Sequence, residues 1–218
     1  MTTVPEQYIT SRPNGWIDWA HTLTSVLPKP FGPRACPLPT LSSPAPSPLG
    51  PATFGPSTPP TLVAFVRHCG CPFAEKELRL LGEQAERNTS LRVVIVQHSS
   101  EADTKDWFER VGGHDLFPDA SRVVLVSDVS RELYAKWGIG TLGWTELVNA
   151  DIMRTLHEGK VKEGLDITKG DWTGWRWQNS GGFAVDAEGK VRWVHLARDS
   201  SDVGKWGEAV DVLFQGAA

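Results

Sequence analysis

The chain has 218 residues, 40% hydrophobic and 22% charged, a composition typical of globular proteins. Its formal net charge of −4 excludes the strongly basic surface that binds nucleic acid. No apolar run approaches the roughly 20 residues of a membrane helix, and the first ten residues carry neither the basic start nor the apolar stretch of a secretory signal. We therefore expect a cytoplasmic protein that acts on a small molecule, with no nucleic-acid or membrane partner.

Proline and tryptophan divide the chain into two parts. Of its 16 prolines, 14 lie in residues 1–60, whereas 8 of its 10 tryptophans follow residue 100. Apolar residues spaced by three and four predict a helix over 15–27. The Pro-rich stretch 28–60 predicts an extended arm, either an ordered wrap or a mobile tether. Residues 61–218 then suit one compact domain.

From residue 61 onward, short apolar runs alternate with helical segments. Apolar, β-branched runs predict strands at 61–67, 91–99, 122–128 and in a hairpin that spans 181–196. Apolar residues at helical spacing predict helices at 72–87, 101–112, 130–138, 145–158 and 202–214. Residues 159–180, rich in glycine and tryptophan, interrupt this order as an insertion.

The order of these elements predicts the fold class. Strands that alternate with helices pair in parallel, because each helix returns the chain to the same end of the sheet. The final hairpin adds two antiparallel strands to that sheet. We expect an α/β fold of three layers, with a mixed central β-sheet and helices on both faces.

The segment FVRHCGCPFAE (65–75) joins the first predicted strand to the first predicted helix. Helix N-termini offer unpaired N–H groups and partial positive charge, which stabilise a thiolate, the form of cysteine that attacks peroxides and disulfides. Cys71, directly before a proline, is best placed for this role, and Arg67 and His68 are expected to add positive charge. Cys69 either packs on the opposite side of the turn or pairs with Cys71. The alternative for both thiols is packing in the core, and no zinc site is expected because a second ligand pair is missing.

Four segments carry a resemblance to a known family: VAFVRHCGCPFAEKELRLL, LRVVIVQHS, ELYAKWGI and WQNSGGFAVDAEGKVRWVHLARDSSD. They are similar to the AhpC/TSA peroxiredoxin-like family of the thioredoxin superfamily, in particular to the AAED1-like group common in filamentous fungi. The resemblance covers about residues 61–214 and implies a thioredoxin-like fold, in agreement with the order of elements. It also implies that Cys71 occupies the position of the family's N-terminal cysteine.

Two departures from this family bear on the reaction. Where redox members have a second cysteine, three residues after the first, this chain has Ala74, which excludes dithiol exchange through a C-x-x-C motif. The peroxiredoxin pattern P-x-x-x-T-x-x-C is absent, because Ala64 and His68 stand at its proline and threonine positions. Gly181 and Gly182 occupy the stretch where thioredoxins place a cis-proline. They either let a substrate approach the nucleophile or only begin a strand.

The insertion supplies further candidates. Trp172, Trp175 and Trp177 either line an apolar ligand site or cover an edge of the core. Arg176, which lies among them, either orients a polar group of a ligand or is a solvated loop charge.

Three functions are compatible with these observations. The first, which we favour, is a thiol-dependent oxidoreductase of peroxiredoxin type that uses Cys71 as nucleophile, no cofactor or metal, and a thiol reductant such as glutathione or thioredoxin. In such an enzyme Cys36 is a candidate to resolve a sulfenic acid. The second is a non-redox isomerase, cyclase or lyase that acts on an apolar small molecule of fungal secondary metabolism. The third is a binding module whose Pro-rich arm is a partner ligand. The oligomeric state is open, with a homodimer as one option.

Overall fold

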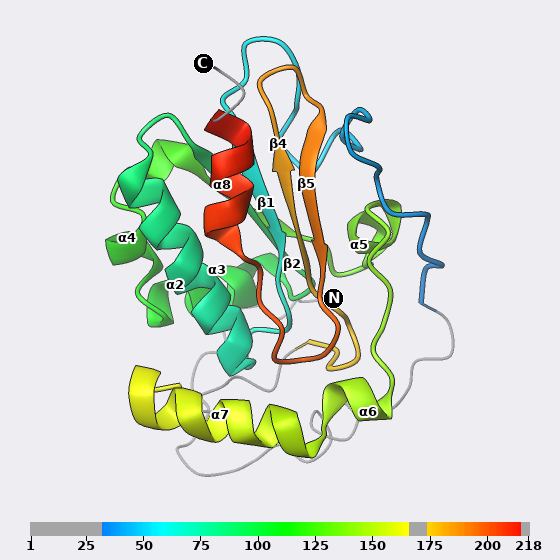
Figure 1. The fold of residues 1–218 in the computed structure, drawn as a ribbon, viewed down its shortest axis with the longest axis vertical. Helices are drawn as coiled ribbons and strands as arrows, with labels where there is room; N and C mark the ends of the chain where they lie inside the picture. The colour runs from blue at the N-terminus through cyan, green and yellow to red at the C-terminus, as the bar shows by residue number, and fades with distance from the viewer. Residues whose placement is uncertain (1–31, 166–173, 215–218) are drawn as a thin grey trace, which may run out of the picture.

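The computed structural model describes residues 32–165 and 174–214. The helix expected over 15–27 and the side chain of Trp172 lie outside the described residues. Within them, a five-stranded sheet carries α2 (Pro72–Arg87) and α8 (Trp206–Phe214) on one face (Figure 1).

The sheet is mixed. Its strands are β1 (Thr61–Phe65), β2 (Arg92–Gln97), β3 (Val123–Ser127), β4 (Gly181–Val185) and β5 (Val191–Leu196). They lie in the order β3-β2-β1-β4-β5. The first three strands pair in parallel, whereas β4 pairs antiparallel with both β1 and β5. The structure therefore confirms the α/β fold with a mixed central sheet.

One face of the sheet holds the long helices. Alternate residues of β1, Leu62 and Ala64, face this side and pack in one apolar cluster with Leu78 and Leu81 of α2 and Trp206 of α8. The same layer is extended by α3 (Glu101–Arg110) and α4 (Gly113–Leu116), a short helix that the sequence pattern does not predict. This layer agrees with the expected three-layer fold.

The opposite face is covered by one short helix and the Pro-rich arm. Tyr134, in α5 (Glu132–Lys136), and Trp137 pack there in a cluster that includes Phe65 of β1. Leu49 and Ala52 of the arm are buried in the same cluster. On this face the extended arm and α5 together cover the sheet, whereas the sequence predicts helices on both faces.

Hydrogen bonds hold the arm against β5. Ser42 donates its N–H to Val191 O (2.7 Å), and Val191 donates its N–H to Ser43 O (2.9 Å). Ala45 donates its N–H to Gly189 O (2.9 Å), in the turn of the hairpin. Of the two alternatives for the arm, its described part is the ordered wrap.

The helix expected over 145–158 is divided into α6 (Trp144–Leu147) and α7 (Ala150–Glu163). Asn149 explains the division, because its side chain accepts the N–H of Ile152 at 2.9 Å and caps the second helix. Since α7 continues to Glu163, the irregular part of the insertion begins later than residue 159. In Figure 1, α7 crosses the end of the molecule at which α2 begins.

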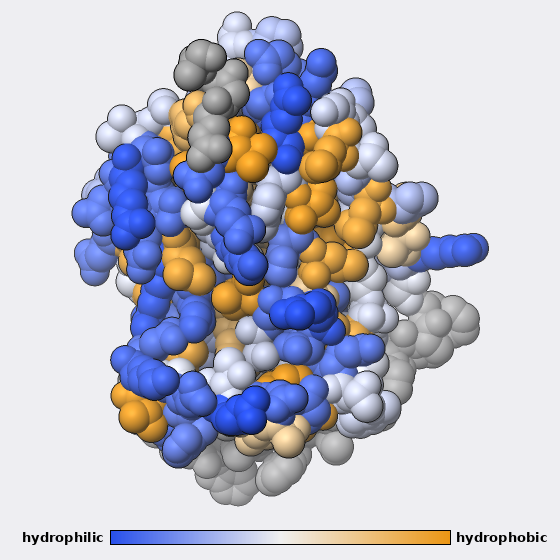
Figure 2. All heavy atoms as spheres, viewed as in Figure 1, coloured by the Kyte–Doolittle hydropathy of each residue, from blue (hydrophilic) through white to orange (hydrophobic). Residues whose placement is uncertain are grey.

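Two contacts fasten the end of α7 to α2. Lys76 forms an ion pair with Glu163 (2.7 Å), and Arg79 donates to Glu163 O (2.8 Å). Hydrophilic side chains cover most of the outward surface of both helices (Figure 2). Among the described residues, none of the helices combines the length and the apolar character that crossing a membrane requires.

Candidate active site

The thiol of Cys71 lies at the N-terminus of α2. The turn after β1 closes with a hydrogen bond from Cys71 N–H to His68 O (2.9 Å). Pro72 takes the first helical position, and Cys71 is the N-cap residue, with no cap hydrogen bond from its side chain. Cys71 is 6% exposed. This residue is therefore nearly buried at the positive end of a helix of 16 residues.

Cys69 faces a different neighbour. Its buried Sγ lies 3.3 Å from Ser99 Oγ and 3.7 Å from Asp103 O, at the start of α3. Cys36, Cys69 and Cys71 are all described, and no disulfide joins them. This arrangement favours packing over pairing for Cys69.

His68 does not supply the positive charge that the sequence suggests. Burial lowers the pKa of its imidazole well below the usual value, and the charges of Arg67, Arg176 and His98 lower it further. The ring is therefore neutral at neutral pH. Its Nδ1 atom accepts the N–H of Gly70 at 3.2 Å, which assigns the proton to Nε2. His68 can donate a hydrogen bond but does not act as a cation.

Arg176 is a source of positive charge near this turn. Burial lowers the pKa of the Arg176 guanidinium, and the negative charge of a Cys71 thiolate opposes this shift, so the two side chains lie within electrostatic reach. Arg67 is buried and donates to the backbone of the same segment, to Arg176 O at 2.8 Å and to Gln178 O at 3.4 Å. Arg176 is half-buried, and its role toward a ligand stays a prediction.

The end of the insertion packs against the ends of β1 and β2. Gly174 has a φ of +87°, and a Cβ there would lie 2.9 Å from the Cβ of His68 and 3.2 Å from Nε2 of His98, so glycine is required. The backbone of Trp175 contacts the same His98 Nε2, with its N at 3.2 Å and its O at 3.0 Å. The Arg131 guanidinium lies 4.1 Å from the centroid of the Trp175 ring.

The described tryptophans of the insertion are buried. Trp175 and Trp177 both have little exposed surface. Trp177 packs edge to face on the exposed Trp144 of α6, with ring centroids 4.5 Å apart. Their burial favours covering the core over lining an open ligand site.

Gly181 and Gly182 begin β4 and face packed side chains. A Cβ at Gly182 would lie 2.6 Å from Cη2 of Trp206, and one at Gly181 would lie 3.2 Å from Cδ1 of Ile139. The protein itself fills the space beside each glycine. This favours the start of a strand over a path for substrate.

Tyr134 is not among the candidates that the sequence pattern indicates. Its hydroxyl lies 2.6 Å from Val66 O and 2.8 Å from Val96 O, so it bridges the ends of β1 and β2 where the cysteine turn begins. Burial raises its pKa well above the usual value, which keeps the hydroxyl protonated as a donor. The spacing of apolar residues in this helix does not indicate that the Tyr134 side chain reaches the ends of β1 and β2.

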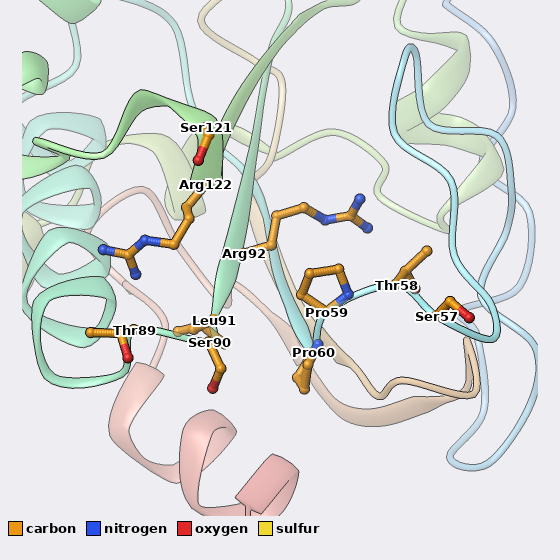
Figure 3. A pocket seen from close by; sticks show the side chains of 10 residues that line it. All are labelled: Ser57, Thr58, Pro59, Pro60, Thr89, Ser90, Leu91, Arg92, Ser121 and Arg122. Carbon is orange, nitrogen blue, oxygen red and sulfur yellow. The ribbon is translucent and has the colours of Figure 1, made fainter.

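Two cavities lie apart from Cys71. The larger, about 490 Å³, is lined by Ser57, Thr58, Pro59, Pro60, Thr89, Ser90, Leu91, Arg92, Ser121 and Arg122. It lies where the parallel strands begin, at the opposite end of the sheet from the turn after β1. Its two guanidinium groups, of Arg92 and Arg122, point away from each other (Figure 3). The smaller, about 300 Å³, lies between residues 50–51 of the arm, α3 and β3. Within the described ranges, no group of three or more His, Cys, Asp or Glu side chains could hold a metal ion.

Solved structures of similar fold include a thiol peroxidase and a peroxiredoxin. The thiol peroxidase from Chromobacterium violaceum has a TM-score of 0.55 and 11% identity, and the match covers 88% of this chain and 95% of that chain. Peroxiredoxin 6 from Arenicola marina has a TM-score of 0.51 and 14% identity, over 80% of this chain and 71% of that chain. At such identities the likeness shows the fold alone, which is thioredoxin-like.

The family follows from the sequence. A model described as AhpC/TSA antioxidant enzyme matches residues 78–199, more than half of the chain. The chain therefore belongs to the AhpC/TSA antioxidant enzyme family. The match begins after Cys71, so the turn that carries this thiol lies outside it. No curated protein matches the chain.

Proposed function

We propose that this protein is a thiol-dependent peroxidase whose nucleophile is Cys71. The observation that carries the proposal is the position of this residue, the N-cap of α2 with no side-chain cap bond, within electrostatic reach of Arg176. A helix N-terminus and a nearby guanidinium both favour the thiolate over the thiol. Membership of the AhpC/TSA antioxidant enzyme family supports the same class of reaction.

In the proposed step, the Cys71 thiolate attacks the terminal oxygen of a hydroperoxide. An S–O bond forms as the O–O bond breaks, the sulfur is oxidised to sulfenic acid, and the peroxide is reduced. The leaving alkoxide takes a proton and departs as an alcohol, or as water when the substrate is hydrogen peroxide. Neutral His68, at the threonine position of the peroxiredoxin pattern, is a candidate hydrogen-bond donor to the peroxide.

Recovery of the thiol requires an external reductant in this proposal. Ala74 stands where a second cysteine would complete a C-x-x-C motif, and the sulfur of Cys69 lies beside Ser99. A thiol such as glutathione or the dithiol of thioredoxin attacks the sulfenic sulfur, releases water and forms a mixed disulfide. A second thiol group then displaces Cys71 and leaves the reductant as a disulfide.

The test is consumption of hydrogen peroxide with glutathione or thioredoxin in excess. We expect Cys71→Ser to fall to the uncatalysed rate, because a serine hydroxyl has no sulfur that peroxide can oxidise to a sulfenic acid. Glu83→Gln, exposed on the same helix, is the control and should retain the rate. Peroxide turnover by Cys71→Ser at the wild-type rate would contradict the proposal.

A further inference from the structure

We propose that the cavity of about 490 Å³, at the opposite end of the sheet from Cys71, binds a small organic carboxylate with an apolar body. The arm and the core form this site together. It does not involve the thiol, so the proposal stands apart from the proposed function.

The cavity has the size of a ligand site, because pockets for small molecules typically measure about 300–1,000 Å³. One wall is the end of the arm, residues 57–60. The other is formed by residues 89–92, where the chain passes from α2 into β2, and by residues 121–122 before β3. A ligand held here would contact both the arm and the sheet, so its binding would also favour the docked position of the arm.

The side chains that line the cavity carry positive charge. These ten described residues include two arginines and no aspartate or glutamate. Arg122 is already engaged by the fold, because its Nε forms an ion pair with Asp119 (3.0 Å) and its Nη1 donates to Ala85 O (2.9 Å) of α2. The charge that remains for a ligand is therefore that of Arg92.

Arg92 is half-buried and has only neutral partners. Its Nε donates to Thr61 Oγ1 at 3.0 Å and its Nη2 to Thr53 O at 2.8 Å, whereas its Nη1 makes no hydrogen bond to another described residue. Burial lowers the pKa of this guanidinium, and no acidic group opposes the shift. A guanidinium in such a position gains from a carboxylate, because hydrogen bonds between charged groups are the strong ones.

The arrangement of the lining favours one carboxylate over a phosphate. The guanidinium groups of Arg92 and Arg122 point away from each other, so they do not converge on one anion (Figure 3). Pro59 and Pro60, whose rings have no hydrogen-bond donor, form the wall beside Arg92 (Figure 3). A single carboxylate on an apolar body matches one available guanidinium beside an apolar wall.

The test is a titration of the ¹⁵N-labelled full chain with cyclohexanecarboxylate, followed by NMR at each backbone amide. We expect saturable shifts at Thr58, Ser90 and Arg92, with a dissociation constant of about 1 mM or lower. Cyclohexanecarboxamide, which has the same ring and no charge, should bind about tenfold more weakly. Inorganic phosphate at equal ionic strength should also bind about tenfold more weakly, because it has no apolar body.

Arg92→Gln should lower the affinity for the carboxylate about tenfold and leave that for the carboxamide unchanged. Arg154→Gln, exposed on α7, is the matched control and should bind the carboxylate as the wild type does. If Arg92→Gln does not fold, the comparison of carboxylate with carboxamide on the wild type still decides between the outcomes.

Four results overturn the proposal: equal affinity for carboxylate and carboxamide, tighter binding of phosphate, unchanged carboxylate binding by Arg92→Gln, or shifts confined to other parts of the chain such as the turn that carries Cys71. The titration contains no peroxide. Its failure would therefore leave the proposed function untouched, and failure of Cys71 to reduce peroxide would leave this site untouched.

Discussion

Glu77 is a buried carboxyl group on α2 that faces the start of α8. Its Oε1 accepts the N–H of Gly204 at 3.0 Å and the indole N–H of Trp206 at 2.7 Å. Burial raises the pKa of this carboxyl from 4.5 to about 7, against the opposing effect of the two hydrogen bonds. The carboxyl group is therefore harder to ionise in the folded protein than in the unfolded chain. Its oxygen accepts the two hydrogen bonds that join α2 to the start of α8.

This residue predicts a pH dependence of stability. Its pKa is higher in the folded state, so its contribution is complete below about pH 4.5 and is lost as the pH rises towards 7. Glu77→Gln keeps the acceptor oxygen and cannot ionise. We expect the variant to match the wild type near pH 4.5 and to exceed its free energy of unfolding at pH 8 by about 1–3 kcal/mol.

Urea denaturation from pH 4.5 to 8 measures this difference. The difference between variant and wild type isolates Glu77 from buried His68 and half-buried His195, whose lowered pKa values act in the opposite direction. Glu83→Gln, exposed on the same helix, should follow the wild type at every pH. Parallel curves for Glu77→Gln and wild type would show that the carboxyl is not perturbed.

At the residue scale, local chemistry can be predicted and distant contacts cannot. The junction of a strand and a helix indicates Cys71, because its environment comes from the next few residues. Glu77 meets Trp206 across 129 positions of sequence, and Arg67 meets Arg176 across 109. Such pairs depend on the completed fold, and no spacing in the sequence indicates them.

The Pro-rich arm acts as an element of the core. Leu49 is fully buried and packs with Trp137 and Val126 on the face of the sheet opposite α2. Proline removes backbone donors, so the arm reaches β5 with the few N–H groups that remain, such as that of Ser42. Apolar residues between the prolines provide the packing.

Truncation of one arm residue tests this role. Leu49→Ala should lower the free energy of unfolding by about 2–5 kcal/mol, because the cavity it leaves lies inside a packed layer. Leu41→Ala, in an exposed position of the same arm, should change it by no more than about 0.5 kcal/mol. Thermal or urea denaturation measures the free energy of unfolding of each variant. Equal effects of the two substitutions would mean that the arm is not part of the core.

At the element scale, periodicity predicts strands and long helices, and capping sets their limits. The alternation of strands with helices and the final hairpin are enough for the mixed sheet. A helical pattern continues across residues 145–158, and only the cap at Asn149 divides it. The sequence leaves open whether the arm docks, because its prolines fit an ordered and a mobile chain equally well.

The whole molecule has two different ends. The parallel strands begin at a cavity of about 490 Å³, and they end at the turn that carries Cys71. At this second end the described part of the insertion packs on the strand ends, and α7 is fastened to α2. The segregation of proline and tryptophan follows this arrangement, with the arm on one face of the sheet and the buried Trp175 and Trp177 in the insertion at the second end.

This arrangement separates accessibility from reactivity. Cys36 is exposed on the arm, whereas Cys71 is nearly buried. If access alone governed oxidation, Cys36 would react first. If the helix N-terminus and Arg176 activate the thiol, Cys71 reacts first although it is less exposed.

The most direct measurement treats the full chain with one equivalent of hydrogen peroxide in the presence of dimedone, which traps sulfenic acids. Peptide mass spectrometry then gives the labelling rate of each cysteine. The account predicts that Cys71 is labelled before Cys36 and that denaturation in urea removes this preference. Labelling of Cys36 first, or no label on Cys71 in the folded protein, would contradict it.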